Sequence, residues 1–519
     1  MYAITTTATH HGVDSFLISV EARLSSGLPK FLIVGLPDAA VREGVERVRA
    51  ALRDTFGEFH NGPCIVNLSP ASRRKAGSAF DLAMAMAIAA AMGKVEPEAV
   101  AAAVFVGELG LDGSLKSAAG TLPATIAAAR AGRARIIVPT ASAREASVIA
   151  GIDVLAAASF ADALRLVREG YRDTPVRTDP EALLANAAIE EGLDLADVRG
   201  LYQPKRALEL AAAGNHHTLF YGPPGAGKTM LARRLAPLLP ALSVGEAIET
   251  TAIHSIAGLI ADTSLMVRRP FRAPHHTTSG AGLVGGGSFP SPGEISLAHN
   301  GVLFLDELPE FVPSVLNQLR EPLEDKHLTI SRAGARLTFP AAFLLVAAMN
   351  PCPCGYHGTG MRECRCNDGV VARYQGRLSG PLLDRIDLHV EVPCIDVEEL
   401  RSSRQEEGSA TVRQRIASAR EHRLRFGPLP LSAGAADRLA LAARKFAMST
   451  RAIERSTAVA RTVAHLAGAT EVSAAHLDEA LQFRSTRERD HACALSLAGP
   501  SGREGEHDAR DRAGRGRAV

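Results

Sequence analysis

The sequence predicts an α/β protein whose central domain holds a parallel sheet and a phosphate-binding loop. Three observations lead to this prediction. The first is GPPGAGKT, Gly222–Thr229, which lies between the apolar run Leu219–Tyr221 and the helix-like Met230–Ala232. The second is GVLFLDEL, Gly301–Leu308, an apolar run that ends in two carboxylates. The third is the alternation of short apolar runs with helical stretches in residues 1–170, which is typical of mixed α/β domains.

The first stretch has the pattern G-x-x-x-x-G-K-T, whose backbone N–H groups can form a cradle for phosphate oxygens. Lys228 would reach the β- and γ-phosphates and Thr229 would hold Mg²⁺, while the helix that follows adds its positive dipole end. A simple Gly/Pro-rich turn is the alternative, but the pattern is too specific to favour it. We therefore predict a site for ATP and Mg²⁺, with these nucleotide-binding residues: Gly222, Pro223, Pro224, Gly225, Ala226, Gly227, Lys228 and Thr229.

Two further apolar runs end in polar residues. Val302–Leu305 suits a buried parallel strand, with Asp306 and Glu307 at its carboxyl end, where open α/β sheets bind ligands. Asp306 would hold Mg²⁺ through water, and Glu307 would orient and polarise the attacking water. A strand that ends in two solvated acids is the alternative. Phe343–Asn350 is the other run and also ends in a polar residue. Its place resembles that of sensor 1 in AAA+ ATPases, which implies that Asn350 would point at the γ-phosphate and the water.

Length and composition limit the classes of protein to which this chain can belong. A chain of 519 residues holds about three domains. Lys and Arg number 58 against 56 Asp and Glu, so the net charge neither supports nor excludes nucleic acid. Tryptophan is absent and aromatic residues make up 4%, which disfavours base stacking as the main binding device. The longest apolar run, Leu82–Met92, is too short to cross a membrane, and the N-terminus lacks a signal-peptide pattern. The seven cysteines, an odd number, favour a reducing cytoplasm.

Two segments of the first domain carry a resemblance. They are NLSPASRRKAGSAFDLAMAMAIAA, from Asn67, and VGELGLDGSLKSAAGTLPA, from Val106. Together they resemble the Lon-protease-like domain that opens the YifB/ComM branch of magnesium-chelatase-like ATPases. In proteolytic Lon domains a serine and a lysine form the catalytic pair. Ser78 lies near the place of the serine, but the place of the lysine falls around Leu122. The resemblance therefore implies a non-proteolytic scaffold.

The resemblance covers nearly the whole chain and implies its division into domains. The expected parts are a Lon-like α/β domain (1–170), a linker (171–194), an AAA+ core (195–395), a helical lid (396–487) and a disordered tail (488–519). The helices expected in these parts are Ala39–Thr55, Phe80–Met92, Pro204–Ala213, Val412–Arg425, Ala433–Phe446, Arg451–Ala467 and Ser473–Phe483, the last capped by Ser473.

The resemblance also implies a function. By this resemblance the chain is identified as a member of a family of hexameric AAA+ ATPases. Family members close to ComM are associated with DNA branch migration during natural transformation. A homo-hexamer acting on branched or single-stranded DNA is thus the leading hypothesis. A protein-remodelling or metal-insertion motor, like magnesium chelatase, is the second, although chelatase subunits lack the N-terminal domain. An ATP-dependent protease is the third, and Leu122 argues against it.

Three arginines gain roles from the resemblance. Arg385, in LSGPLLDRIDLHVEV, matches the arginine that enters the neighbouring subunit's nucleotide site, where such a charge can raise the rate about 10³–10⁵-fold. It could instead pair with Asp384 or Asp387. Arg320 is a second candidate for work between subunits. Arg451 matches sensor 2 and would reach the γ-phosphate as the lid closes, or it is a surface arginine in the first turn of a helix.

A hairpin is predicted before the strand of Asn350, where Thr329–Ser331 and Arg336–Phe339 flank a turn. Magnesium chelatases and MCM helicases carry a hairpin at this place, and in MCM-like rings it faces the pore. Arg332 and Arg336 could contact DNA phosphates without regard to sequence. Solvated arginines on an exposed hairpin are the alternative.

Two clusters could bind a metal. The first consists of two C-x-C pairs separated by nine residues, Cys352, Cys354, Cys364 and Cys366. Four clustered thiols could close a tetrahedral zinc site, although the spacing departs from the usual C-x₂₋₄-C. The second is His275 and His276 in FRAPHHTTSG, within a stretch that resembles an insert of the family. Adjacent histidines in a loop more often form ordinary hydrogen bonds.

Overall fold

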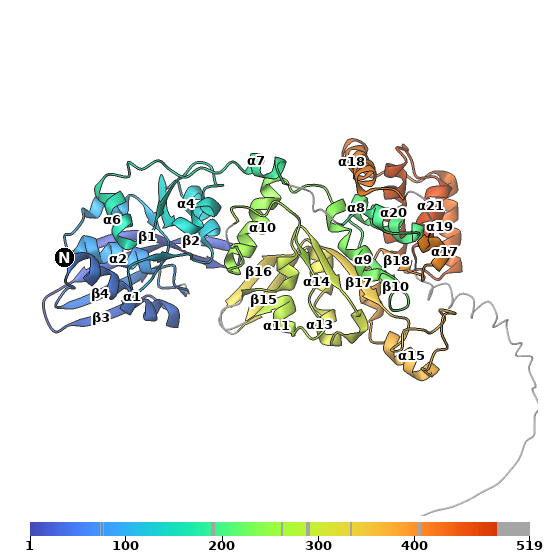
Figure 1. The fold of residues 1–519 in the computed structure, drawn as a ribbon, viewed down its shortest axis with the longest axis horizontal. Helices are drawn as coiled ribbons and strands as arrows, with labels where there is room; N and C mark the ends of the chain where they lie inside the picture. The colour runs from blue at the N-terminus through green and yellow to red at the C-terminus, as the bar shows by residue number, and fades with distance from the viewer. Residues whose placement is uncertain are drawn as a thin grey trace, which may run out of the picture.

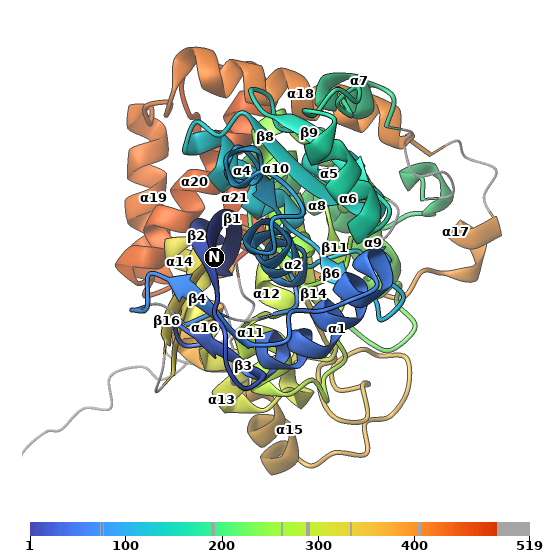
Figure 2. The same ribbon diagram turned by 90° about the vertical axis from the view of Figure 1, so that its left-hand side faces the viewer.

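The computed structural model describes residues 1–72, 74–75, 77–187, 193–260, 263–286, 291–332, 335–401 and 406–484. Figure 1 shows a first sheet beside the N-terminus, a second sheet in the middle and helices α18–α21 at the far end. Figure 2 shows the molecule from the end that holds the N-terminus. The predicted disordered tail, 488–519, lies outside the described residues, and the predicted domain boundaries stay predictions.

The first sheet has seven strands in the order β3-β4-β2-β1-β5-β8-β9. Their bounds are β1 Tyr2–His11, β2 Asp14–Leu24, β3 Lys30–Val34, β4 Pro63–Ser69, β5 Val104–Phe105, β8 Arg135–Pro139 and β9 Asp153–Ala157. Strand β2 runs antiparallel to both β1 and β4, and the remaining pairs are parallel. The sheet therefore combines parallel and antiparallel pairs, a feature that the predicted α/β domain left open.

Helices lie on both faces of the first sheet, although the outer side of β3 and β4 stays exposed. Helix α1 (Ala39–Phe56) is capped by Asp38, whose side chain accepts a hydrogen bond from the N–H of Val41. Helix α2 (Asp81–Ala91) is apolar on all sides and fully buried, which places it at the centre of the first core. These two helices confirm the helices predicted in this region. Helix α6 (Phe160–Arg168) joins the same core, whereas α4 (Thr121–Arg130) lies against a second apolar cluster.

The second sheet has five strands in the order β11-β14-β17-β10-β18, and all of its pairs are parallel. Their bounds are β10 Thr218–Tyr221, β11 Phe271–Arg272, β14 Val302–Leu305, β17 Leu344–Met349 and β18 Leu388–Glu391. The parallel sheet predicted for the central domain is thus confirmed. Because the strands are parallel, the carboxyl ends of β10, β14 and β17 meet at one edge of the sheet.

The four predicted C-terminal helices are present. They are α18 Ser409–Phe426, α19 Ala433–Lys445, α20 Thr450–Leu466 and α21 Ala474–Gln482. The Ser473 side chain accepts a hydrogen bond from the N–H of His476, which confirms its predicted cap. Helices α18 and α20 pack on α8 (Tyr202–Gly214), and one apolar cluster joins them to the sheet. Their role as a lid remains a prediction.

Shorter elements complete the fold. They are α3 Pro97–Ala101, β6 Glu108–Leu109, β7 Leu115–Lys116, η1 Thr140–Ser142, α5 Ala143–Ala146, α7 Pro180–Ala185, η2 Leu195–Asp197, α9 Lys228–Arg233, η3 Ala236–Leu238, α10 Val244–Ile256, α11 Gly280–Val284, β12 Gly285–Gly286, β13 Ser291–Pro292, α12 Glu294–Leu297, η4 Leu308–Glu310, α13 Pro313–Asn317, α14 Arg320–Asp325, β15 His327–Arg332, β16 Ala335–Pro340, α15 Asp368–Gln375, α16 Gly380–Leu383 and α17 Val397–Arg401. In the described part of the chain, no helix combines the length and the apolar character needed to cross a membrane.

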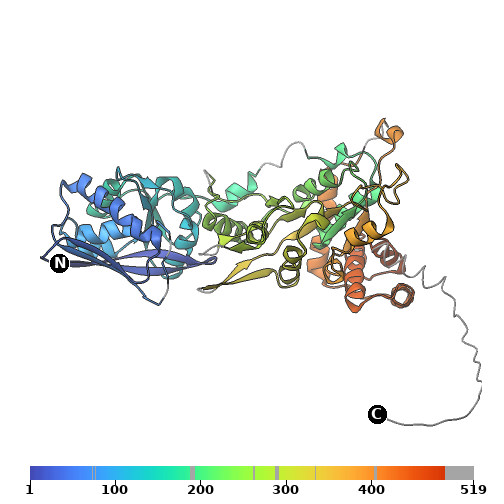
Figure 3. The same cartoon turned by 90° about the horizontal axis from the view of Figure 1, so that it is seen from below.

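The two sheet-containing parts touch at two places. At the first, α4 packs against α10, and the N–H of Gly120 donates to the backbone oxygen of Ser255 at 3.1 Å. At the second, the β1–β2 turn meets the β15–β16 hairpin, where a Cβ on Gly12 would lie 3.1 Å from the backbone oxygen of Thr338. Figure 3 shows the ends of β1 and β2 beside this hairpin.

Candidate nucleotide-binding site

The predicted phosphate-binding loop connects β10 to α9 at the carboxyl edge of the second sheet (Figure 1). Gly225 and Gly227 have φ angles of 79° and 93°, a region in which residues with a Cβ are strained. Gly222 needs its small size for another reason, because a Cβ there would lie 2.2 Å from the backbone oxygen of Val392. The three glycines of the loop are therefore required by its geometry.

The Lys228 ammonium lies inside this loop. It donates hydrogen bonds to the backbone oxygens of Gly222 at 2.7 Å and Pro223 at 2.8 Å. A third bond, of 3.0 Å, reaches Oδ1 of Asn350 at the end of β17. Burial lowers the pKa of Lys228, and the nearby Asp306 carboxylate partly offsets this effect. The structure thus brings together the predicted lysine and the predicted γ-phosphate contact.

A hydroxyl and a carboxylate meet beside the lysine. The Thr229 hydroxyl donates to Oδ2 of Asp306 at 2.7 Å, and Oδ1 of Asp306 accepts from the N–H of Glu307 at 2.9 Å. Hydroxyl and carboxylate oxygens are hard ligands of the kind that Mg²⁺ prefers. The residues present therefore fit the predicted magnesium site.

The Glu307 backbone is left-handed, with φ 50°, and its side chain faces a histidine. Oε2 of Glu307 lies 3.1 Å from Nδ1 of His276. The neighbouring His275 stacks on His276 with ring centroids 4.1 Å apart and forms a 2.9 Å hydrogen bond with the Thr277 hydroxyl. The two histidines thus make ordinary polar contacts, and in the described residues they belong to no group of three metal ligands.

The predicted inter-subunit arginine lies elsewhere. Arg385 precedes β18, so it stands at the amino edge of the parallel sheet, opposite the phosphate-binding loop. Its Nη2 lies 2.9 Å from Oε1 of Glu324, and its Nη1 donates to the backbone oxygen of Pro381 at 2.6 Å. The same Glu324 oxygen lies 3.3 Å from Nη2 of Arg451. Arg385 and Arg451 therefore share one carboxylate, far from Lys228.

The alternative partners of Arg385 are not used. Asp387 instead accepts from the N–H of His217 at 2.8 Å and from Nη1 of Arg455 at 2.9 Å. Arg320, the second candidate, begins the short helix α14 that also carries Glu324. The arginines suggested for contacts between subunits thus gather around one helix at the amino edge of the sheet.

The predicted hairpin is confirmed as β15 and β16, in which Ser331 pairs with Arg336. One face is apolar and buried: Ile330, Leu337 and Phe339 pack against Val13 of the first sheet's turn. The other face is exposed and includes Thr329, Ser331, Arg336 and Thr338. Arg336 therefore lies on a polar surface. The side chain of Arg332, like the turn at 333–334, lies outside the described residues.

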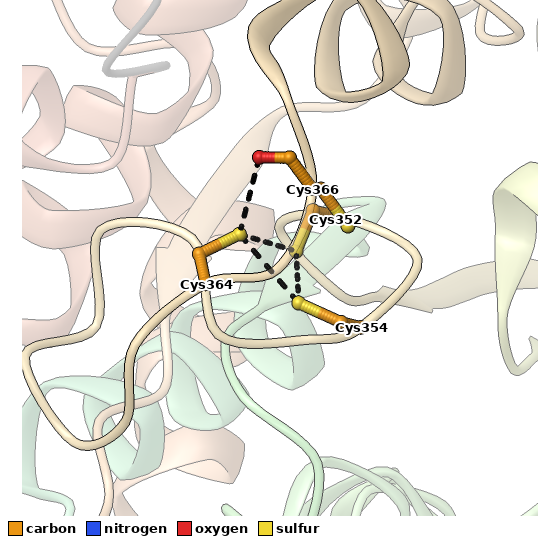
Figure 4. Close-up of side chains that lie close together, drawn as sticks. All are labelled: Cys352, Cys354, Cys364 and Cys366. Carbon is orange, nitrogen blue, oxygen red and sulfur yellow. Dashed lines mark hydrogen bonds between the residues drawn. The ribbon is translucent and has the colours of Figure 1, made fainter.

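The four predicted cysteines converge in the loop after β17 (Figure 4). The sulfur of Cys352 lies 3.3 Å from that of Cys354 and 3.7 Å from that of Cys364, and Cys354 and Cys364 are 3.5 Å apart. The sulfur of Cys366 completes a set in which the four atoms lie within 4.8 Å of one another. Backbone N–H groups of Tyr356 and Arg365 lower the pKa of Cys354 to about 6, whereas burial and the neighbouring thiols raise the pKa of Cys364 and Cys366.

Comparison with known proteins agrees with this geometry. Residues 194–400 match the model described as magnesium chelatase, subunit ChlI, residues 20–142 match subunit ChlI of Mg-chelatase, and residues 406–484 match the ChlI C-terminal model. The chain is 42% identical over 490 residues to the competence protein ComM of Haemophilus influenzae, an alignment that covers 91% of this chain and 96% of that protein. The chain belongs to the YifB/ComM family of magnesium-chelatase-like proteins.

Two further relatives show similarity, one over most of the chain and one over a part of it. The YifB protein of Escherichia coli K12 is 40% identical over 495 residues, which cover 91% of this chain and 95% of YifB. Lon protease 2 of Bacillus subtilis is 31% identical over 150 residues, 26% of each chain. The parallel sheet of this YifB/ComM protein fits an AAA+ type core, and the family implies the use of ATP and Mg²⁺.

The likeness to a Lon protease directs attention to Ser78. Its hydroxyl donates to a carboxylate oxygen of Glu108 beside a cavity of about 90 Å³ that His10 also lines. Leu122 is fully buried in an apolar cluster with α10, and its N–H donates to Oε1 of Glu145 at 3.0 Å. No ammonium group can therefore come from this position, as the non-proteolytic interpretation requires.

Three residues of these sites were absent from the sequence interpretation: Glu108, His276 in its contact with Glu307, and Glu324. Their partners lie far away in the sequence, so no local pattern marks these contacts. The nearest signal for Glu324 was its position in the same LREPLED segment as Arg320.

Proposed function

We propose that this chain is a ring-forming ATPase in which one subunit binds ATP and the next supplies arginine. One observation carries the proposal. Lys228, Thr229, Asp306 and Asn350 meet at the carboxyl edge of the sheet, whereas Arg385 lies at its amino edge. A strand of four residues spans about 13 Å, which is longer than an arginine side chain. The arginine therefore suits a nucleotide bound by a neighbouring subunit.

Each residue of the carboxyl edge has a role in this proposal. The N–H groups of the loop and the Lys228 ammonium bind phosphate oxygens, and Asn350 orients the terminal phosphate through its contact with Lys228. Thr229 and Asp306 would hold Mg²⁺, which neutralises phosphate charge when it is bound. Glu307 orients and polarises the attacking water. In this proposal Glu307 must leave His276 before it can act.

The arginines complete the site in a ring. A closed ring repeats one head-to-tail contact, so every Arg385 meets the loop of one neighbour. Arg451 shares Glu324 with Arg385, and we propose that it acts at the γ-phosphate when the C-terminal helices move. The hexameric state is carried over from the family, as is a cytoplasmic location, which suits the free thiols of the chain.

We propose DNA as the substrate, with branch migration or another remodelling reaction as the outcome. The named relative is a competence protein, and the exposed polar face of the hairpin carries Arg336. Arg332 and Arg336 would contact phosphates rather than base edges. Remodelling of a protein partner is the second candidate, because the near-balanced charge of the chain offers no general attraction for nucleic acid.

The test is ATP turnover with and without forked DNA. Wild-type ATP turnover should rise with forked DNA. Lys228→Ala should abolish ATP turnover, because the phosphates lose their ammonium partner. The double variant Arg332→Ala, Arg336→Ala should keep basal turnover but lose DNA binding, with Thr338→Ala on the same exposed face as the matched control. Unchanged turnover with DNA, together with intact binding by the double variant, would leave the protein-remodelling candidate.

A further inference from the structure

The segment 350–367 follows β17 and precedes α15 without a helix or strand of its own. Loops longer than about 15 residues are uncommon in compact domains unless they serve a function. Its own backbone contributes few contacts, such as the 2.9 Å bond from the N–H of Gly355 to the oxygen of Cys352. The four cysteine side chains of this segment converge, and they supply the main contact within it.

The sulfur positions fit one tetrahedral ion. Bonds of about 2.3 Å to a central zinc place the sulfurs about 3.8 Å apart. The three closest pairs here are separated by 3.3, 3.5 and 3.7 Å, and all four cysteines are free thiols. Four thiolates select zinc or iron among common metals, and a multinuclear iron–sulfur cluster would hold its cysteines further apart.

The same segment touches the nucleotide site at two points. Gly355 has φ 86° and packs on the phosphate-binding loop so closely that a Cβ would lie 2.5 Å from Cδ of Pro224. Asn350 stands two residues before Cys352. The next carbonyl, of Pro351, accepts from Nε2 of Gln375 at 2.9 Å.

We propose that Cys352, Cys354, Cys364 and Cys366 bind one zinc ion that holds this loop against the phosphate-binding loop and fixes Asn350. The ion makes no contact with ATP. It acts by positioning, since Gly355 supports Pro224 from one side and Cys352 anchors the chain just after Asn350. The effect on nucleotide affinity rests on the proposed ATP site, whereas the metal site itself does not.

The metal is tested first, on the full-length protein purified without added metal. Elemental analysis should find about one zinc per chain, which is what four thiolates hold. Cys354→Ser and Cys364→Ser should each lose it. Cys64→Ala, which removes a thiol from the first sheet, should keep it. Wild-type protein with iron or with no metal would overturn the zinc assignment.

The effect of the metal-held loop on nucleotide affinity is tested with Gly355→Ala, a variant that keeps all four cysteines. It should keep its zinc but bind a fluorescent ATP analogue about tenfold more weakly, as should the zinc-free cysteine variants. Gly358→Ala is the matched control, because a methyl group there meets nothing within 4 Å. Unchanged nucleotide affinity in Gly355→Ala and in the zinc-free protein would overturn the coupling. Zinc-loaded wild type that binds no ATP would instead overturn the proposed function.

Discussion

The position of Arg385 allows a test that uses two inactive variants. Arg385→Ala removes the guanidinium at the amino edge of the sheet, and Lys228→Ala removes the ammonium at the carboxyl edge. Each alone should lower ATP turnover by about 10³-fold or more, because each removes positive charge from the transferring phosphoryl group. An unassembled Arg385→Ala subunit should bind ATP as the unassembled wild-type subunit does, since its own loop is about 13 Å away across β18.

The magnitude of the mixing effect follows from ring geometry. In a ring assembled at random from equal amounts of both variants, a site works when one subunit keeps Lys228 and its neighbour keeps Arg385. That combination occurs at about one quarter of the contacts, so turnover should recover to about one quarter of the wild-type value. The assay is steady-state phosphate release after the two variants are dissociated, mixed and reassembled.

Recovery far below this level would refute the reasoning. If Arg385 served its own chain, every chain in the mixture would lack one essential group, and turnover would stay at the level of the single variants. Arg385 is 4% exposed, so its replacement can also loosen the fold. Arg451→Ala is a second arginine variant that can be mixed with Lys228→Ala. Arg451 contacts the same Glu324 but is half-exposed.

Three further predictions follow from single contacts. His276→Ala should raise basal ATP turnover without changing ATP affinity, because it releases Glu307; a fall in turnover would contradict this. Acidification from pH 8 to pH 5 should lower the free energy of unfolding by about 2 kcal/mol through His217, whose pKa burial lowers to about 4 from about 6.5. The unfolded chain binds the proton first as the pH falls below 6.5, so the stability is lost between pH 6.5 and 4, and a urea midpoint unchanged at pH 5 would count against it. Peptidase activity, if any is found, should be equal in wild type and Ser78→Ala, because Leu122 offers no base.

Elements with regular spacing could be predicted from the sequence. The glycine loop and the apolar runs before Asp306 and Asn350 are local patterns, and the structure has them where they were expected. Strand β1 was missed because most of its buried positions are threonines and the rest are alanines, although β-branched residues also favour strands. The partner of Arg385 could not be predicted, because Asp384 and Asp387 are near in sequence while Glu324 is near only in space.

The contact between the two sheet-containing parts also bears on what the first part does. By the resemblance, the place of the protease lysine falls around Leu122, which is buried where α4 meets α10. Burying an ammonium there would cost several kcal/mol, so this contact and that catalytic group exclude each other. The first sheet's turn also packs on the apolar face of the β15–β16 hairpin. The hairpin therefore cannot move on that face without displacing the turn.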